Sequence, residues 1–352
     1  MFFKEIRIEN FRGIESLIIN NIKQVNLITG RNNCGKTSVL EAVFLLTGMS
    51  NPQLPVLIHN FRDLSLTDDE DFSYFFNKFD ISNNPKINGK SDSQERTLEI
   101  KAIYSAFSEI PKQISTEQIL LSNSSDVVGS RIEGLNLIFN LGKEKTFQSE
   151  IRLKQNEIKV PRDYKEKLVA YFINPGTVMK DMDRRLNAIL IRKDLGTIIN
   201  SLKEIEPQLL DIRMGAGGVV YADIGVDRLI PINVMGDGIR RILAMLAAIS
   251  ERKNGILLID EIENGLHYTT LSILWKAILK AASDNNVQLF ITTHSYECVQ
   301  AIAKIYQDQK AVIEKDFISL FRIEKNSKGQ HRAFQYTADT LIAGIEKEFE
   351  VR

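Results

Sequence analysis

The sequence contains few cysteines and no excess of charge of either sign. Its 352 residues include only Cys34 and Cys298, which supply neither a disulfide framework nor metal-ligand spacing. Lys plus Arg and Asp plus Glu both number 45, so the formal net charge is zero and the chain as a whole is not expected to attract nucleic acid. A hydrophobic content of 43% and a charged content of 26% are ordinary for a globular protein of one to three domains.

Long apolar segments are also lacking. The start of the chain, from Met1 to Ile6, carries no basic region followed by a long apolar stretch, so a signal peptide is not expected. No run approaches the ~20 apolar residues that span a membrane. We therefore expect no membrane partner and a cytoplasmic location.

A glycine-rich loop at residues 30–37 fits the phosphate-loop pattern G-x-x-x-x-G-K-[ST] at every fixed position. A short apolar strand at 24–29 precedes it and a helix at 37–46 follows it. Glycines let backbone N–H groups turn inward around a polyphosphate, and the helix N-terminus adds partial positive charge. Lys36 would add a full charge, and the Thr37 hydroxyl would ligate Mg²⁺. The alternative is a plain glycine-containing turn between strand and helix.

A second apolar strand, residues 255–259, ends in the adjacent carboxylates Asp260 and Glu261. An all-apolar strand is typical of a parallel sheet covered on both faces, and such sheets bind ligands at the carboxyl ends of their strands. We expect Asp260 to hold Mg²⁺, directly or through water, and Glu261 to polarise the attacking water. A buried strand that merely ends in a charged turn is the alternative.

A third apolar strand, residues 287–292, leads into Thr293, His294 and Ser295. An imidazole near the γ-phosphate can hydrogen-bond it and report its presence. We predict this role for His294, against the alternative of an ordinary residue at a strand end or cap.

These motifs together resemble the ABC-type ATPases of the RecF, SMC and OLD (overcoming lysogenization defect) branch. The resemblance is carried by Asn32-Asn33 in the loop, by residues 258–267 (Leu-Ile-Asp-Glu-Ile-Glu-Asn-Gly-Leu-His), by residues 292–295 (Thr-Thr-His-Ser) and by Asn10-Phe11-Arg12. It covers about residues 1–50 and 205–300 and is strongest to stand-alone OLD-like ATPases, which are often found beside an effector protein in bacterial defence modules. The resemblance implies ATP and Mg²⁺ as ligands. The loop residues expected to contact the nucleotide are Gly30, Asn32, Asn33, Cys34, Gly35, Lys36, Thr37 and Ser38.

In this family two heads sandwich two ATP molecules, and the loop of one head faces a glycine-containing signature helix of the other. The matching residues here would be Gly236, Asp237 and Gly238, which open a helix running to Ile249. The segment lacks the serine of the transporter-type Leu-Ser-Gly-Gly-Gln, which argues against a membrane transporter. A Gly-capped turn before an amphipathic helix is the alternative. The resemblance also makes residues 264–267 a dimer-interface loop, although a turn at a helix start would look the same.

The fold class expected from these features is α/β: a P-loop NTPase head of ABC type with a flanking antiparallel sheet and a short helical insertion. We divide the chain into an N-terminal half of the core with the phosphate loop, 1–50, an insertion, 51–204, and a C-terminal half of the core, 205–352. Within the insertion we expect a helix-like stretch at 68–76, strands at 97–104 and 135–140, a loop at 115–130, and a segment at 148–153 that pairs with the preceding strand. Residues 179–210 have helical composition interrupted by Gly196, without a heptad repeat long enough for a coiled-coil arm.

Two basic groups are candidate contacts for DNA, although most such clusters are solvated faces. The first comprises Lys154, Lys159, Arg162, Lys165 and Lys167, and the second comprises Arg184, Arg185, Arg192 and Lys193. Full OLD proteins carry a further metal-dependent nuclease domain. Asp181 and Asp183 form the Asp-x-Asp pattern, but upstream on a helix-like segment, so we expect no intrinsic nuclease.

Two hypotheses of function remain. In the first, the protein is an ATP hydrolase that dimerises, or forms a higher homo-oligomer, around ATP and acts as a sensor or scaffold for a separate effector in anti-phage defence. In the second, it is a RecF-like ATPase that loads on DNA. A nucleotide switch that binds ATP but barely turns it over is a third option, and Glu261 argues against it. The sequence identifies neither the effector nor the trigger.

Overall fold

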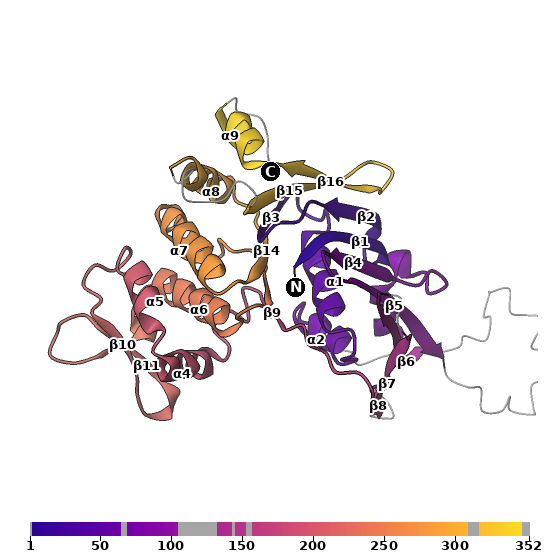
Figure 1. The fold of residues 1–352 in the computed structure, drawn as a ribbon, viewed down its shortest axis with the longest axis horizontal. Helices are drawn as coiled ribbons and strands as arrows, with labels where there is room; N and C mark the ends of the chain where they lie inside the picture. Colours follow the sequence, from indigo (N-terminus) through magenta and orange to yellow (C-terminus); the bar gives the residue numbers. More distant parts are fainter. Residues whose placement is uncertain are drawn as a thin grey trace, which may run out of the picture.

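Two sheets enclose one helix at the centre of the molecule. The computed structural model describes residues 2–64, 69–104, 132–142, 145–152, 157–308 and 317–346. Helix α1 (Lys36–Thr47) lies between an antiparallel sheet and a mainly parallel sheet, and further helices cover the outer face of the parallel sheet (Figure 1). The loop predicted at 115–130 lies outside the described residues, as does Lys154.

The mainly parallel sheet has the strand order β16-β15-β3-β14-β13-β9. All neighbouring pairs are parallel except β15 with β16, which form an antiparallel hairpin. Its strands are β3 (Val25–Thr29), β9 (Ala170–Ile173), β13 (Ile256–Ile259), β14 (Gln288–Thr292), β15 (Ile318–Lys325) and β16 (His331–Tyr336). The strands predicted at 24–29, 255–259 and 287–292 are thus confirmed, and their carboxyl ends meet at one edge.

The antiparallel sheet has the order β2-β1-β4-β5-β6-β7-β8. Its strands are β1 (Phe3–Phe11), β2 (Ile14–Asn20), β4 (Lys86–Ser91), β5 (Glu95–Tyr104), β6 (Ile132–Leu141), β7 (Phe147–Arg152) and β8 (Glu157–Lys159). The predicted strands at 97–104 and 135–140 are confirmed, and β7 pairs with β6 as expected, with Leu135 opposite Ile151. The flanking antiparallel sheet of the predicted fold class is therefore present.

Alternation along the central strands gives the molecule two hydrophobic cores. On β13, Leu257 and Ile259 face the outer helices, whereas Ile256 and Leu258 face α1 and the antiparallel sheet. All four side chains are buried, which explains why this strand is apolar throughout. The sheet is thereby held rigidly between two layers, and the loops at its carboxyl edge are held with it.

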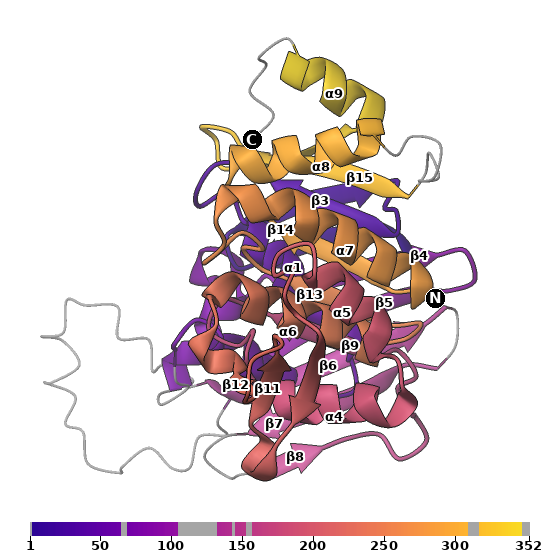
Figure 2. The same cartoon turned by 90° about the vertical axis from the view of Figure 1, so that its left-hand side faces the viewer.

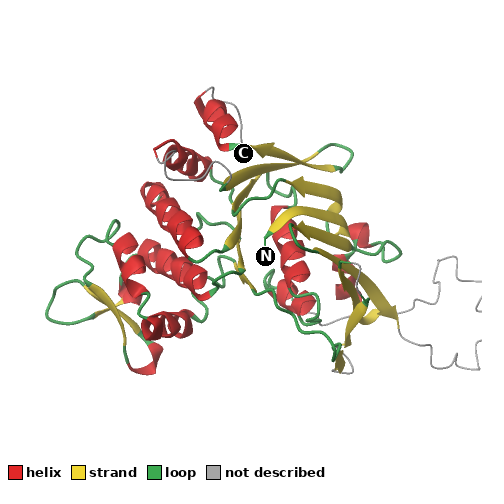
Figure 3. Ribbon diagram, in the orientation of Figure 1, coloured by secondary structure: helices red, strands yellow, loops and turns green. Residues whose placement is uncertain are grey.

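Helices cover the outer face of the parallel sheet and continue into a small lobe (Figures 2 and 3). They are α6 (Asp237–Glu251), α7 (Leu271–Asp284), α8 (Tyr296–Asp308) and α9 (Ala338–Glu346); the lobe contains α4 (Met182–Arg192), α5 (Leu195–Leu202), β10 (Asp211–Met214), β11 (Val220–Asp223) and β12 (Ile230–Pro231). On the inner side, α2 (Leu54–Asn60) and the 3₁₀ turns η1 (Asp69–Phe75) and η2 (Asn77–Phe79) follow α1. Of the helices in the described part of the chain, none is long and apolar enough to cross a bilayer.

Two expectations need correction. The helical stretch at 179–210 breaks at Lys193, which ends α4 in the left-handed conformation with φ +59°, and Gly196 lies within α5. The segment 51–204, assigned to an insertion, contains β9, which pairs with β13 in the core sheet. A four-residue strand followed by a turn carries too weak a pattern to be assigned from sequence.

Candidate functional site

The loop between β3 and α1 has the backbone geometry that its glycines permit. Gly30 and Gly35 have φ angles of +140° and +94°, a region that residues with a Cβ rarely adopt. A Cβ on Gly30 would also overlap the carbonyl oxygen of Ile323 on β15. The predicted strand, loop and helix therefore occur in order, and the loop is packed against a strand from the far end of the chain.

Lys36 is folded back onto this loop. Its Nζ donates hydrogen bonds to the carbonyl oxygens of Gly30 at 2.7 Å and Arg31 at 3.0 Å. Burial lowers the pKa of the Lys36 amine, and the neighbouring Cys34 and Asp260 partly oppose that shift. An anion with several oxygens would accept hydrogen bonds from the Lys36 ammonium group and balance its charge.

Thr37, Asp260 and Thr292 converge from three elements. Thr37 Oγ1 donates to Asp260 Oδ2 at 3.0 Å, and Thr292 Oγ1 donates to Asp260 Oδ1 at 2.5 Å. Mg²⁺ binds oxygen octahedrally at about 2.0–2.1 Å, which sets adjacent ligand oxygens about 2.8–3.0 Å apart. The separation of Thr37 Oγ1 and Asp260 Oδ2 fits that spacing.

A cation at this point would take its other ligands from water and phosphate. Among the residues that the structure describes, no three His, Cys, Asp or Glu side chains are grouped to hold a metal ion. One carboxylate, one hydroxyl and several non-protein oxygens form the ligand set that Mg²⁺ usually has in proteins. The residues present therefore fit Mg²⁺ that arrives with a polyphosphate.

Glu261 occupies a strained backbone position at the edge of the sheet. Its φ is +51°, in the left-handed region that costs a non-glycine residue of order 1 kcal/mol or more. The Glu261 N–H donates to Thr292 Oγ1 at 2.9 Å, and the next N–H, of Ile262, donates to the Thr292 carbonyl at 3.1 Å. These bonds hold the strain in place, and strain held in this way is common at functional sites.

His294 lies beside Glu261. Its Nε2 is 3.8 Å from Glu261 Oε1, and its backbone N–H donates to Glu263 Oε1 at 2.7 Å. Both side chains line a cavity of ≈ 330 Å³ together with Asn32, Glu263 and Asn264. The structure thus brings the three predicted motifs to one opening, with carboxylate and imidazole next to the phosphate loop.

A buried cluster of charged side chains lies next to the phosphate loop. Glu41, one turn after Thr37 on α1, is 1% exposed and accepts two hydrogen bonds from Arg62, from Nε at 2.6 Å and from Nη2 at 3.1 Å. Arg12 Nε lies 2.6 Å from the second Glu41 oxygen. One carboxylate between two guanidiniums leaves a net positive charge beside the loop, and Arg62 Nη2 also donates to Ser38 Oγ at 3.4 Å.

The predicted signature residues are not among those that line the cavities beside the phosphate loop. Gly236 has open space around it, and the nearest atom to a Cβ on Gly238 would belong to Leu266, in the loop after β13. Gly236 and Asp237 are exposed at the N-terminus of α6. The phosphate loop, Asp260, Glu261 and His294 therefore form one site, while the signature residues begin α6, with Gly236 and Asp237 exposed and Gly238 half-buried.

Sequence reasoning missed several residues. The sequence pattern gives Thr292 no role of its own, yet its hydroxyl bonds Asp260. The contact of Arg62 with Glu41 joins residues 21 apart that no local pattern links. The second basic group needs correction. Arg185 is fully buried, stacked 4.1 Å from the Tyr171 ring and 3.5 Å from Glu251, so the group does not form one exposed surface.

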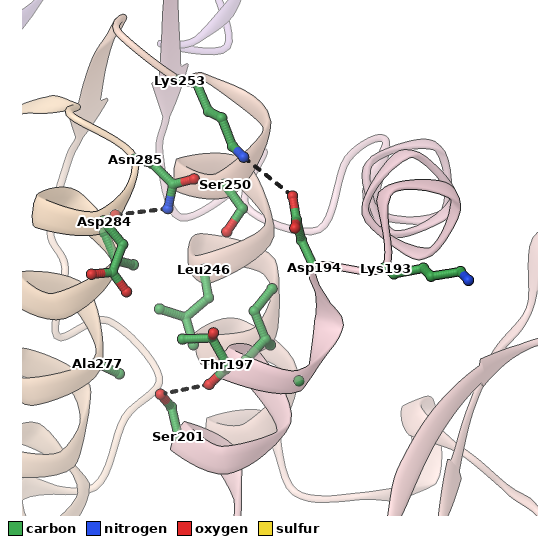
Figure 4. A pocket seen from close by; sticks show the side chains of 13 residues that line it. Lys193, Asp194, Thr197, Ser201, Leu246, Ser250, Lys253, Ala277, Asp284 and Asn285 are labelled. Carbon is green, nitrogen blue, oxygen red and sulfur yellow. Dashed lines mark hydrogen bonds and ion pairs between the residues drawn. The ribbon is translucent and has the colours of Figure 1, made fainter.

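Another cavity, of ≈ 330 Å³, lies between α5, α6 and α7 (Figure 4). Its walls include Ser250, Asp284 and the ion pair of Lys253 with Asp194 at 3.2 Å. These residues precede the amino ends of β13 and β14, whereas the motif residues follow the carboxyl ends. This cavity is therefore at the opposite end of the sheet from the phosphate loop.

Comparison with known proteins agrees with this geometry. Residues 25–299 match the model of the family described as "AAA domain, putative AbiEii toxin, Type IV TA system". A Helicobacter pylori protein named ATP/GTP phosphatase is 25% identical over 343 residues, 89% of each chain. The DNA replication and repair protein RecF of Bacillus thuringiensis is 30% identical over 138 residues, 39% of this chain and 33% of that protein. A solved SMC head bound to the C-winged helix domain of ScpA superposes with a TM-score of 0.52 at 10% identity, over 96% of this chain and 99% of that chain. The superposition shows the fold: a P-loop NTPase head with antiparallel sheets.

Proposed function

Because the chain belongs to this family of AAA-type ATPases, we propose that it is a Mg²⁺-dependent ATPase whose heads pair around ATP and signal their nucleotide state to a separate effector protein in bacterial anti-phage defence. The observation that carries the proposal is the approach of Thr37 Oγ1 to Asp260 Oδ2 at 3.0 Å, where two of the motifs meet.

Each side chain has a task in this scheme. Lys36 exchanges its two carbonyl partners for the outer phosphates, and the loop N–H groups hold the inner ones. Thr37 and Asp260 would hold Mg²⁺, which neutralises charge on the phosphate oxygens. Glu261 accepts the proton of the attacking water, and His294 donates a hydrogen bond to the γ-phosphate.

Pairing of two heads supplies what one head lacks. The opening beside Glu261 and His294 is lined by polar residues of one chain, and Gly236 and Gly238 are not among them. The N-terminus of α6, a fifteen-residue helix, carries partial positive charge that suits a γ-phosphate. In the dimer this helix end caps the nucleotide held by the partner, so hydrolysis requires two heads.

The effector role is supported by the family's description, which names a toxin and a toxin–antitoxin system and so suits one member of a two-protein module. The zero net charge and the burial of Arg185 disfavour a broad DNA-binding surface. The second candidate, a RecF-like ATPase that acts on DNA, is favoured by the similarity to RecF over 138 residues.

The test is steady-state ATP hydrolysis by the purified protein with and without Mg²⁺ and short duplex DNA that has free ends. We expect slow Mg²⁺-dependent turnover that DNA does not change. Lys36→Ala should lose ATP binding, and Glu261→Gln should bind ATP but hydrolyse it at least a hundredfold more slowly, eluting as a dimer. The matched variant Glu263→Gln keeps an oxygen for the His294 N–H and should retain turnover within about threefold.

A mixing experiment tests the composite site. Gly238→Arg should bind ATP without hydrolysing it, and Lys36→Ala should do neither. When the two variants are combined in equal amounts, half of the dimers contain one chain of each. Each such heterodimer has one intact site out of two, so up to about a quarter of wild-type turnover should return. Full turnover by Gly238→Arg alone would refute the sandwich, and stimulation of the wild type by DNA would replace the effector role with the RecF-like one.

A further inference from the structure

A cavity of ≈ 460 Å³ lies beside the phosphate loop, and its walls come from both ends of the chain. Gly35 lines it from the loop, Ser38 from α1 and Arg12 from the turn after β1. Lys325 and His331 line it from the β15–β16 hairpin. Pockets for small ligands have volumes of about 300–1,000 Å³, so this one has room for a nucleoside.

His331 is the unexplained group in this cavity. The residue is 6% exposed, and neither Nδ1 nor Nε2 has a hydrogen-bond partner among the described residues. A Cβ placed on Gly35 would lie 3.6 Å from Nε2, so the ring touches the phosphate loop itself. Burying a polar ring without hydrogen-bond partners is unfavourable. A ligand that forms hydrogen bonds with this ring would therefore bind more tightly.

The ring suits a hydroxyl better than a phosphate. Burial lowers the pKa of His331, the charge of Lys325 lowers it further, and Glu15 opposes the shift. These effects favour the neutral imidazole, which presents one N–H donor and one nitrogen acceptor. A hydroxyl group both accepts and donates, so a pair of sugar hydroxyls can satisfy such a ring.

The position of His331 relative to the loop indicates that its ring would meet the sugar of a bound nucleotide. The loop N–H groups hold the phosphates, the ribose follows the innermost phosphate, and the base extends beyond it. His331 adjoins the loop, and Tyr74 and Phe79, with ring centroids 5.7 Å apart, also line this cavity. Phe79 is 64% exposed, so its ring offers apolar surface on which a base can stack.

We propose that His331 hydrogen-bonds the ribose hydroxyls of the bound nucleoside triphosphate, so that the β15–β16 hairpin distinguishes ribonucleotides from nucleotides without these hydroxyls. This proposal rests on the proposed function, because it requires triphosphate binding at the loop. His331 is placed by its pairing with Lys325 in the hairpin, and the Asn21 Nδ2, just after β2, donates to Gln335 Oε1 on the same strand at 3.1 Å.

The test is a calorimetric titration of the full chain with Mg²⁺-ATP and with Mg²⁺-2′,3′-dideoxy-ATP. We expect the wild type to bind ATP about three- to tenfold more tightly than the dideoxy analogue, the value of one or two hydrogen bonds. His331→Ala should bind both equally, with its affinity for the analogue within about twofold of wild type. His331→Asn should restore part of the preference. Arg332→Ala, the exposed next residue of β16, should keep all of it.

The outcomes distinguish a failure of the ribose contact from a failure of the proposed function on which it rests. A wild type that binds neither nucleotide, or a Lys36→Ala variant that still binds ATP, overturns the proposed function and this inference with it. If ATP binds and depends on Lys36, but His331→Ala keeps the wild-type preference, the ribose contact is refuted. Equal weakening of both ligands with the preference retained means that His331 only supports the fold, and it refutes the contact as well.

Discussion

Replacing Glu41 by glutamine should destabilise the head more than any single surface change, because it leaves two guanidiniums around a neutral amide. Glu41 is 1% exposed, and Arg12 and Arg62 are 8% and 35% exposed. Breaking a buried pair by removing one partner costs about 3–5 kcal/mol. Arg62 can turn toward water and Arg12 cannot, so we expect the lower end, about 3 kcal/mol.

That loss of unfolding free energy corresponds to a decrease in the melting temperature, Tm. The entropy of unfolding is about 2.1 cal/mol/K per residue, which for 352 residues gives about 0.7 kcal/mol/K, so Tm should fall by about 4 °C. The assay is thermal unfolding followed by circular dichroism. Arg62→Ala leaves Glu41 paired with Arg12 and should lower Tm by only about 1–2 °C. The exposed Glu324→Gln should change Tm by less than 1 °C. A Glu41→Gln protein that melts within 1 °C of wild type would refute the reasoning.

Three further predictions concern the site itself. Thr292→Val should leave ATP affinity within about threefold but slow hydrolysis about ten- to a hundredfold, because Asp260 loses the hydroxyl that orients it; unchanged turnover would count against that role. Because burial lowers the pKa of Lys36, ATP affinity measured from pH 7 to 10 should decline before the ordinary lysine value of 10.5 is reached, and a flat profile would contradict this. Burial raises the pKa of Cys298 to about 12, so iodoacetamide at pH 8 should label it only after denaturation, as judged by peptide mass spectrometry.

The parts of the site that the sequence predicts are those in which strand, turn and helix follow one another along the chain. The loop at residues 30–37, Asp260 and His294 each follow an apolar strand, and parallel strands bring their carboxyl ends to one edge. Local pattern was therefore enough to bring these groups together in three dimensions.

The parts that the sequence does not predict depend on pairings between distant segments. Glu41 and Arg62 look like ordinary surface charges until the fold buries the carboxylate between two arginines. His331 carries no motif, and only the hairpin's position beside Gly35 gives it a possible ligand. β9 is short and lies next to β13 only because the chain returns to the core after the antiparallel sheet. In each case the tertiary partner, and not the local sequence, sets the role.

The place of β3 in its sheet has a consequence for biosynthesis. β3 lies between β14 and β15, so the strand that bears the phosphate loop emerges early from the ribosome and finds its hydrogen-bonding neighbours late. The N–H of Phe3 likewise has its acceptor, Gln288 Oε1 at 2.9 Å, only after residue 288 has been synthesised. At about 5–20 residues per second, translation from Thr29 to Gln288 takes about 13–50 s, during which an apolar strand has two open edges. Nascent chains stalled before β14 should therefore bind chaperones rather than ATP, and the nucleotide can assist only the last step of folding.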